Sequence, residues 1–187
     1  MPYENGWTGY AGAKLEELWS LIGHHDLVYR GTPDPLNFTG GLKGEHDLSG
    51  DVFSHFGNGY YYTKRYDIAC LTAGFGGVVT VHRYVWQKVT QLELVVRELR
   101  NADWEEVVRG NIGSESGELA LKTVDIEADF VIGSLVEDVW DVRCGGTPVE
   151  TGVWVGSAKS AKAREFMMEG LEAVIFLDLR PGEMKRR

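Results

Sequence analysis

Residues 53–63 read Phe-Ser-His-Phe-Gly-Asn-Gly-Tyr-Tyr-Tyr-Thr, and this stretch says most about the fold. Its alternating glycines, Gly57 and Gly59, allow the backbone to turn sharply and to lie close to a flat ligand. Three consecutive tyrosines then place large rings with polar tips on both faces of the segment that follows. The same pattern is also typical of a strand whose tyrosines pack half inward and half outward. It is not a phosphate-binding glycine loop, because neither GxGxxG after a strand nor GxxxxGK occurs.

Apolar periodicity on both sides of this stretch predicts helices and strands in irregular order. Residues 32–50 are expected to form a long loop, and long loops in compact domains are often functional. Helices are predicted over Ala13–Ile22, Lys64–Ala73, Leu92–Leu99, Trp104–Val108 and Ala158–Met168, and strands over Asp26–Gly31, Gly77–Trp86, Asp129–Gly133, Gly152–Gly156 and Ala173–Leu179. Because the strands and helices do not alternate strictly, the expected class is α+β.

Composition places the chain among ordinary globular proteins. It has 187 residues, of which 43% are hydrophobic and 25% charged, and this suits one domain with its own core. The net charge of −9 argues against nonspecific binding to nucleic acid or to an anionic membrane, since both need a basic surface. Cys70 and Cys144 match no metal or disulfide spacing and are expected to be reduced thiols.

The sequence also sets expectations about location. The N-terminus lacks the basic and apolar regions of a secretory signal, and no apolar run approaches the length of a membrane span. We therefore expect a cytoplasmic protein, or one delivered by a secretion route that needs no signal peptide.

Four side chains stand out as candidates for chemistry. Arg30 lies on a predicted strand between apolar residues and a glycine. It is either a surface arginine whose stem covers apolar neighbours, or a fixed set of donors for a phosphate or ribose oxygen. Glu137 and Glu150 flank predicted strands, where an acidic residue either faces solvent or serves a site. His55 adjoins the glycines, although a lone histidine is more often structural.

Taken in order along the chain, several short motifs resemble those of the ADP-ribosyltransferase-like superfamily. The resemblance is to its poly-ADP-ribose-polymerase type and to a group of related bacterial domains, and it spans roughly residues 27–175. The matching segments are "YRGT" at Tyr29–Thr32, "FGxGxYxT" at Phe56–Thr63, Ala69 in the next helix, the tryptophan-bearing helix Trp104–Asn111, and "VIGxxxxD" from Val131 to Asp138. The ordered set is moderately specific, and no single motif decides it.

The chain mixes the patterns of two branches of that superfamily. The polymerase type has histidine where this chain has Arg30, and arginine at that position is usual in the toxin-like branch. The toxin-like branch also has a Ser-Thr-Ser strand and a Glu-x-Glu turn, and neither occurs here.

The resemblance implies a fold and a set of roles. The whole chain, residues 1–187, would form one ADP-ribosyltransferase-like domain: two small packed β-sheets with flanking helices around an NAD cleft. Arg30 would hold a ribose or phosphate, the backbone of Gly31 would bind the carboxamide, and Tyr61 or Tyr62 would stack on nicotinamide. Gly59 belongs to the same expected NAD-binding set. The catalytic acid would be Glu150, which is narrowly preferred, or Glu137; Asp138 beside it matches a family aspartate.

The function implied is an NAD-dependent ADP-ribosyltransferase. It would cleave the nicotinamide–ribose bond and transfer ADP-ribose to an acceptor that the sequence does not identify, whether macromolecule or small molecule. The alternatives are an NAD glycohydrolase or phosphorylase toxin, and a catalytically inactive NAD-binding or interaction module on the same fold. NAD is expected as substrate, without a metal or a membrane partner, and the acidic charge disfavours a nucleic-acid acceptor. A toxin of this type would have an antitoxin or immunity protein as its partner.

Overall fold

The computed structural model describes residues 17–34, 55–57, 59–112 and 127–177. Its strands are β1 (Leu27–Thr32), β2 (Tyr60–Thr63), β3 (Val78–Arg83), β4 (Val96–Glu98), β5 (Phe130–Val136), β6 (Glu150–Ala158) and β7 (Leu171–Phe176). Its helices are the 3-10 turn η1 (His24–Asp26), α2 (Tyr66–Ala73), α3 (Trp86–Gln91), α4 (Asn101–Ile112), α5 (Val139–Arg143) and α6 (Ala161–Glu169), after a helical segment at residues 17–21.

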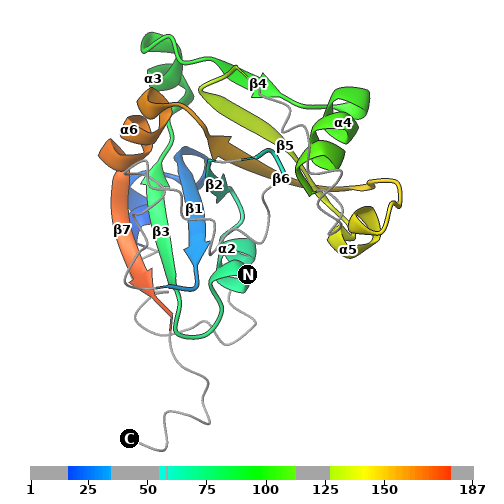
Figure 1. Ribbon diagram of the computed structural model, residues 1–187. Helices are drawn as coiled ribbons and strands as arrows, with labels where there is room; N and C mark the ends of the chain where they lie inside the picture. The colour runs from blue at the N-terminus through cyan, green and yellow to red at the C-terminus, as the bar shows by residue number, and fades with distance from the viewer. Residues whose placement is uncertain (1–16, 35–54, 58, 113–126, 178–187) are drawn as a thin grey trace, which may run out of the picture.

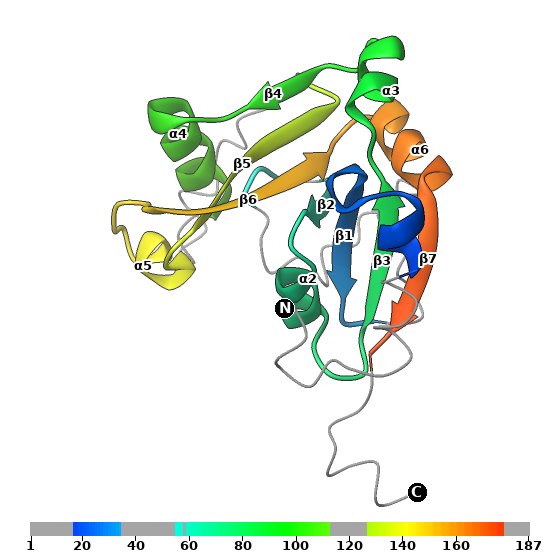
Figure 2. The same ribbon diagram turned by 180° about the vertical axis from the view of Figure 1, so that it is seen from behind.

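The strands form one mixed sheet in the order β4-β5-β6-β2-β1-β3-β7, with helices at its flanks (Figure 1). Only β4 and β5 are parallel; the other neighbours are antiparallel. Strands β4, β5 and β6 run at a steep angle to β1, β3 and β7, as the view from behind also shows (Figure 2). The predicted α+β class is confirmed.

The prediction of two packed sheets is wrong, because the short strand β2 joins the two halves. All four β2 residues pair with β6, from Tyr60↔Ala158 to Thr63↔Val155, whereas β2 meets β1 at the single pair Tyr29↔Thr63. Hydrogen bonding on both sides of β2 leaves no free edge between the halves, and a sheet edge left unpaired is what separates two sheets. The result is one continuous sheet with a weak seam between β1 and β2.

Buried side chains gather on both faces of this sheet. On one face α2 packs over β1, β3 and β7, and α4 packs over β5 and β6; on the other, α3 and α6 cover the sheet. The largest fully buried side chains include those of Tyr60, Phe56, Phe130, Leu27 and Leu99. The core is therefore split into clusters by the sheet itself, and the seam between β1 and β2 lies among them.

The helix predicted over Leu92–Leu99 is also wrong. Helix α3 ends at Gln91, and Glu93 has a positive φ of 55°, which stops helical winding. Val96–Glu98 then forms β4 and pairs with Phe130–Ile132 of β5. The Asp129 carboxylate accepts a hydrogen bond from the Val95 amide at 2.7 Å, which fixes the entry to this strand. A short apolar run fits both the helical period and the strand period, and here the pairing with β5 made the segment a strand.

The remaining predicted elements are found with shifted ends. The predictions at residues 64–73, 104–108 and 158–168 correspond to α2, α4 and α6, and those at residues 26–31, 77–86, 129–133, 152–156 and 173–179 to β1, β3, β5, β6 and β7. Within the first predicted helix, residues 17–21 are helical. Residues 13–16, most of the predicted loop at 32–50, and residues 178–179 lie outside the described residues. Helices α3 and α5 were not predicted.

Within the described ranges, no helix combines the length and the apolarity that crossing a membrane requires.

Candidate functional site

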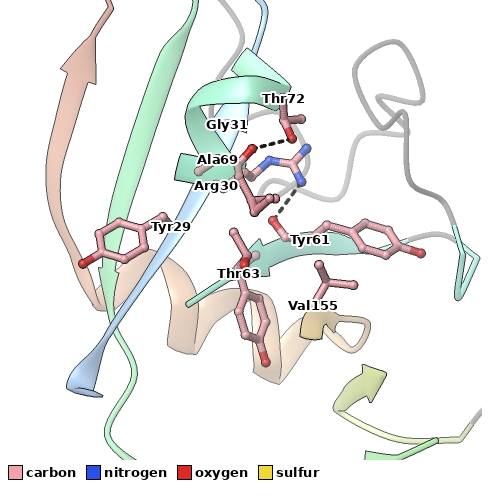
Figure 3. Close-up of a pocket in the computed structure, with 10 residues that line it drawn as sticks. Tyr29, Arg30, Gly31, Tyr61, Thr63, Ala69, Thr72 and Val155 are labelled. Carbon is pink, nitrogen blue, oxygen red and sulfur yellow. Dashed lines mark hydrogen bonds between the residues drawn. The ribbon is translucent and has the colours of Figure 1, made fainter. Parts of the chain in front are cut away.

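The seam between β1 and β2 places Arg30 at the centre of the candidate site. Beyond the Tyr29↔Thr63 pair the two strands separate, so the backbone of Tyr61 is not paired with β1. The Arg30 guanidinium fills this place: Nη1 donates a hydrogen bond to the Tyr61 carbonyl oxygen at 3.1 Å (Figure 3). The Arg30 side chain thus makes the hydrogen bond to a strand carbonyl that a backbone amide of the neighbouring strand makes in a regular β-ladder.

A small pocket of about 40 Å³ opens at the same seam. It is lined by residues of β1, β2, α2 and β6: Tyr29, Arg30, Gly31, Tyr61, Tyr62, Thr63, Ile68, Ala69, Thr72 and Val155 (Figure 3). Of the residues that the sequence analysis selected, the structure therefore brings together Arg30, Gly31, Tyr61 and Tyr62. Thr72 and Val155 were not predicted, because nothing in their local sequence shows that α2 and β6 meet at this point.

Gly31 sets how closely α2 approaches the site. A Cβ atom at this position would lie 1.8 Å from the carbonyl oxygen of Ala69 and 2.8 Å from the amide nitrogen of Ala73. Only a residue without a side chain allows β1 and the α2 backbone to meet in this way. Gly31 thereby closes one wall of the pocket next to Arg30.

Arg30 is buried, with only 8% of its surface exposed. The guanidinium carbon lies 4.3 Å from the centroid of the Tyr60 ring, a cation–π contact. The alternative that Arg30 is a surface arginine is therefore wrong. A charge inside a protein is costly unless fixed polar partners surround it, so a buried arginine at a pocket wall is a notable feature of this fold.

The tyrosines beside it are held mainly by the protein's own contacts. Tyr61 accepts a hydrogen bond from the Phe56 amide at 2.9 Å and donates one to the Gly57 carbonyl at 2.5 Å, and its ring stacks on Phe56. The Tyr62 ring packs against Tyr84 and Phe130, and burial raises its pKa well above the usual value. Both residues are less than a tenth exposed, so each ring presents little area to a ligand in this conformation.

The turn before β2 is tied to the sheet by residues that do not line the pocket. A Cβ atom on Gly59 would lie 2.0 Å from Ser157 Oγ, so this glycine permits close contact with β6. His55 is fully buried, and its Nε2 accepts a hydrogen bond from the Val136 amide at 3.1 Å. Burial lowers the pKa of His55 to about 4, so the ring is neutral and can accept that bond. His55 is thus structural here.

The candidate acids lie away from the Arg30 pocket. Glu137 and Glu150 are both exposed, at the far ends of β5 and β6. Glu150 pairs with Val136 and Val155 pairs with Gly133, so three residues of β5 separate the acid from the pocket, which is about 10 Å at about 3.3 Å per residue. Glu137 instead lines a separate surface hollow of about 360 Å³ with Asp138, Asp141, Thr147 and Val149. Asp138 serves as the N-cap of α5, since its carboxylate accepts from the Asp141 amide at 3.0 Å.

No group of three or more histidine, cysteine, aspartate or glutamate side chains arranged to hold a metal ion occurs in the part of the chain that the structure describes.

No protein-family model matches the chain, and no curated protein is similar to it in sequence.

Proposed function

We propose that the chain is an NAD-dependent ADP-ribosyltransferase whose NAD-binding site is the seam between β1 and β2. One observation carries the proposal: a buried arginine, Arg30, lies at a pocket wall together with Gly31, Tyr61 and Tyr62. The order of the motifs along the chain, which resembles the ADP-ribosyltransferase-like superfamily, supports the choice of NAD over other nucleotides.

Arg30 suits one polar group of such a ligand. Its guanidinium is always charged and presents several donors in a fixed plane, which matches phosphate and ribose oxygens. The pocket volume of about 40 Å³ is of the order of one or two water molecules. Only the group that Arg30 contacts can enter the pocket in this conformation, and the rest of the NAD molecule lies across its mouth.

The proposed reaction breaks the bond between nicotinamide and the ribose carbon. Nicotinamide leaves with the bonding electrons, and the acceptor supplies a new pair to the ribose carbon. A carboxylate favours this step because it stabilises the positive charge that develops on the ribose. Glu150 and Glu137 remain the candidates, and either one can act only where the bound NAD, or a rearranged β6, brings the ribose to the far end of β5 and β6.

A specific observation favours a second function, that of a catalytically inactive NAD-binding module. None of the residues that line the described pocket is acidic. A pocket with a fixed cation and no carboxylate binds an anion without assisting the departure of nicotinamide.

Incubation of the purified chain with NAD⁺ labelled in its adenylate separates these functions. Transfer gives a labelled acceptor and free nicotinamide, whereas hydrolysis gives free ADP-ribose and nicotinamide. Binding without turnover means an inactive module, and no binding at all contradicts the proposal. Arg30→Ala is the site variant. Arg109→Ala is its matched control, because Arg109 is exposed and pairs with Glu105 at 3.0 Å on α4.

A further inference from the structure

A buried polar network lies behind Arg30, on the face of the sheet opposite α2. Its members are Tyr60 of β2 and Thr80 and His82 of β3, all of which are fully buried. Tyr60 Oη lies 2.8 Å from His82 Nε2 and 2.9 Å from Thr80 Oγ1. Thr80 also donates to the carbonyl oxygen of Arg30 at 3.5 Å, and the two residues are direct partners in the β1–β3 register. Arg30 therefore contacts this network twice, through its carbonyl oxygen at Thr80 and through its guanidinium on the Tyr60 ring.

The contacts of His82 fix the direction of the hydrogen bonds. Its Nδ1 lies 2.7 Å from the carbonyl oxygen of Met167 on α6, and a carbonyl can only accept, so Nδ1 carries the proton. Burial lowers the pKa of His82 to about 4; the nearby charge of Arg30 also lowers it, and the hydrogen bond to Met167 opposes the shift. The ring is therefore neutral and Nε2 is an acceptor. Tyr60 Oη at 2.8 Å is nearer to Nε2 than Thr80 Oγ1 at 3.2 Å, and we assign the Tyr60 hydroxyl as the donor.

This arrangement holds the Tyr60 ring in one orientation. The hydroxyl is fixed by His82 at one end, and the His82 ring stands edge-on to the Tyr60 ring with 5.3 Å between centroids. The face of the Tyr60 ring then lies against the Arg30 guanidinium at 4.3 Å. A ring whose plane is fixed by a hydrogen bond can in turn fix the plane of the cation on its face.

We propose that Tyr60 and His82 are positioning residues for Arg30: His82 orients the Tyr60 ring, and this ring holds the Arg30 guanidinium at the pocket wall. The identity of the ligand rests on the proposed function, whereas the positioning itself does not. A free arginine samples many rotamers, and holding the guanidinium in place before binding reduces the entropy that the ligand must offset.

The alternative is that Tyr60, Thr80 and His82 only satisfy one another inside the core. The two cases differ in whether Arg30 becomes disordered when the Tyr60 ring is retained but its hydroxyl is no longer held by His82. His82→Leu removes the acceptor of the Tyr60 hydroxyl, while His82→Gln supplies an amide oxygen near the former Nε2 position. Tyr60→Leu removes the ring, while Tyr60→Phe keeps the ring and loses only the hydroxyl.

The first measurement needs no ligand. In the full ¹⁵N-labelled chain, we expect the {¹H}–¹⁵N NOE of Arg30 Nε to be as high as that of the ordered backbone. It should fall to flexible values in Tyr60→Leu and His82→Leu and recover in His82→Gln. An Arg30 Nε that stays equally ordered in Tyr60→Leu and His82→Leu overturns the positioning role. If a leucine variant fails to fold, Tyr60→Phe carries the test, because it keeps the ring and loses only the hydroxyl that His82 holds. We expect a lower NOE of Arg30 Nε in Tyr60→Phe, and a value equal to that of the wild type overturns the positioning role.

The second measurement is a double-mutant cycle with ADP-ribose as the calorimetric probe. Loss of a buried cation–π contact should weaken binding about tenfold in Tyr60→Leu. Because Tyr60 acts through Arg30, the double variant Arg30→Ala/Tyr60→Leu should bind no more weakly than Arg30→Ala alone. A further tenfold loss in the double variant contradicts the proposal, since Tyr60 would then contribute independently of Arg30.

The two measurements separate the two ideas. If the wild-type chain does not bind ADP-ribose, the proposed function fails, and the NOE series still decides whether Tyr60 and His82 position Arg30. If binding is found but the NOE of Arg30 is unaffected by every variant, the function stands and the positioning role is rejected.

Discussion

At the scale of single residues, Arg30 is where the sequence and the structure converge. The sequence placed it on a strand before a glycine, and the structure buries it at the seam between β1 and β2 with a hydrogen bond to the Tyr61 carbonyl. A guanidinium at a pocket wall suits an anionic ligand, because hydrogen bonds from a charged donor are stronger than neutral ones.

Arg30→Ala should therefore weaken NAD⁺ binding by tenfold to a hundredfold, the range of about 1.5–3 kcal/mol for a lost hydrogen bond to a charged group. Calorimetry with the folded variant measures the change. Arg109→Ala should bind as the wild type does, and equal affinity in Arg30→Ala would show that the guanidinium serves the fold alone.

The two candidate acids can be separated by their effect on rate. A carboxylate that stabilises a ribosyl cation acts in the transition state, so its loss should lower kcat far more than it weakens ground-state binding. We expect Glu150→Gln to reduce the rate of nicotinamide release by about a hundredfold or more, and Glu137→Gln to reduce it much less. The reverse order moves the assignment to Glu137. Normal turnover in both variants means that the reaction uses neither carboxylate.

At the scale of elements, the turn that leads into β2 depends on Tyr61. Its hydroxyl bonds both to the Phe56 amide and to the Gly57 carbonyl, and so bridges the start of the turn. Tyr61→Phe keeps the ring stacked on Phe56 but leaves these two backbone groups without that partner. The expected loss in the free energy of unfolding is about 1–3 kcal/mol. Urea denaturation measures it, and faster amide exchange at Phe56 should accompany it; unchanged exchange there would contradict the role of the hydroxyl.

The contact between β1 and α2 depends on Gly31. A methyl group at this position meets the Ala69 backbone at 1.8 Å, so Gly31→Ala must displace the strand or the helix. We expect a cost of about 1–3 kcal/mol or more from overpacking. Gly145→Ala is the comparison variant: the φ of Gly145 is 94° and nothing lies within 4 Å of its added Cβ, so this change adds backbone strain without a steric clash. If the two variants lose equal stability in thermal unfolding, the steric argument fails.

At the scale of the whole molecule, two buried histidines link stability to pH. Burial lowers the pKa of both His55 and His82 to about 4, whereas an unfolded histidine titrates near 6.5. Between these values the unfolded chain binds protons that the folded chain does not, so stability falls as pH falls through this window. The loss should approach about 3 kcal/mol per histidine near pH 4, and full stability should be present above about pH 6.5.

Urea unfolding at several pH values measures this slope. His55→Gln should remove the contribution of one histidine and make the dependence shallower. His25→Gln, a change at an exposed histidine, is the control variant. A stability that stays constant from pH 7 to pH 4.5 contradicts the expectation.

The sequence by itself determined the α+β class and most of the elements. Helix α4 is an example: Trp104, Val107 and Val108 lie on one buried face. Their spacing is the helical period, which can be recognised within a short stretch of sequence. The sequence also placed Arg30 on a strand and a glycine-rich turn before Tyr60–Tyr62. These features are local, because they depend on backbone freedom and on side-chain spacing within a few residues.

Only the tertiary structure decided that the sheet is continuous and which residues share the pocket. The pair Tyr60↔Ala158 joins segments almost a hundred residues apart, and no local pattern specifies such a partner. A second long-range pairing, between β4 and β5, gave Val96–Glu98 a strand conformation where the local pattern had predicted a helix. Pairing of β6 with β5 also left Glu150 opposite Val136, about 10 Å along the sheet from Val155 at the pocket. Strand pairing between distant segments and burial compete with local conformational preference, and they decided which residues meet at the seam between β1 and β2.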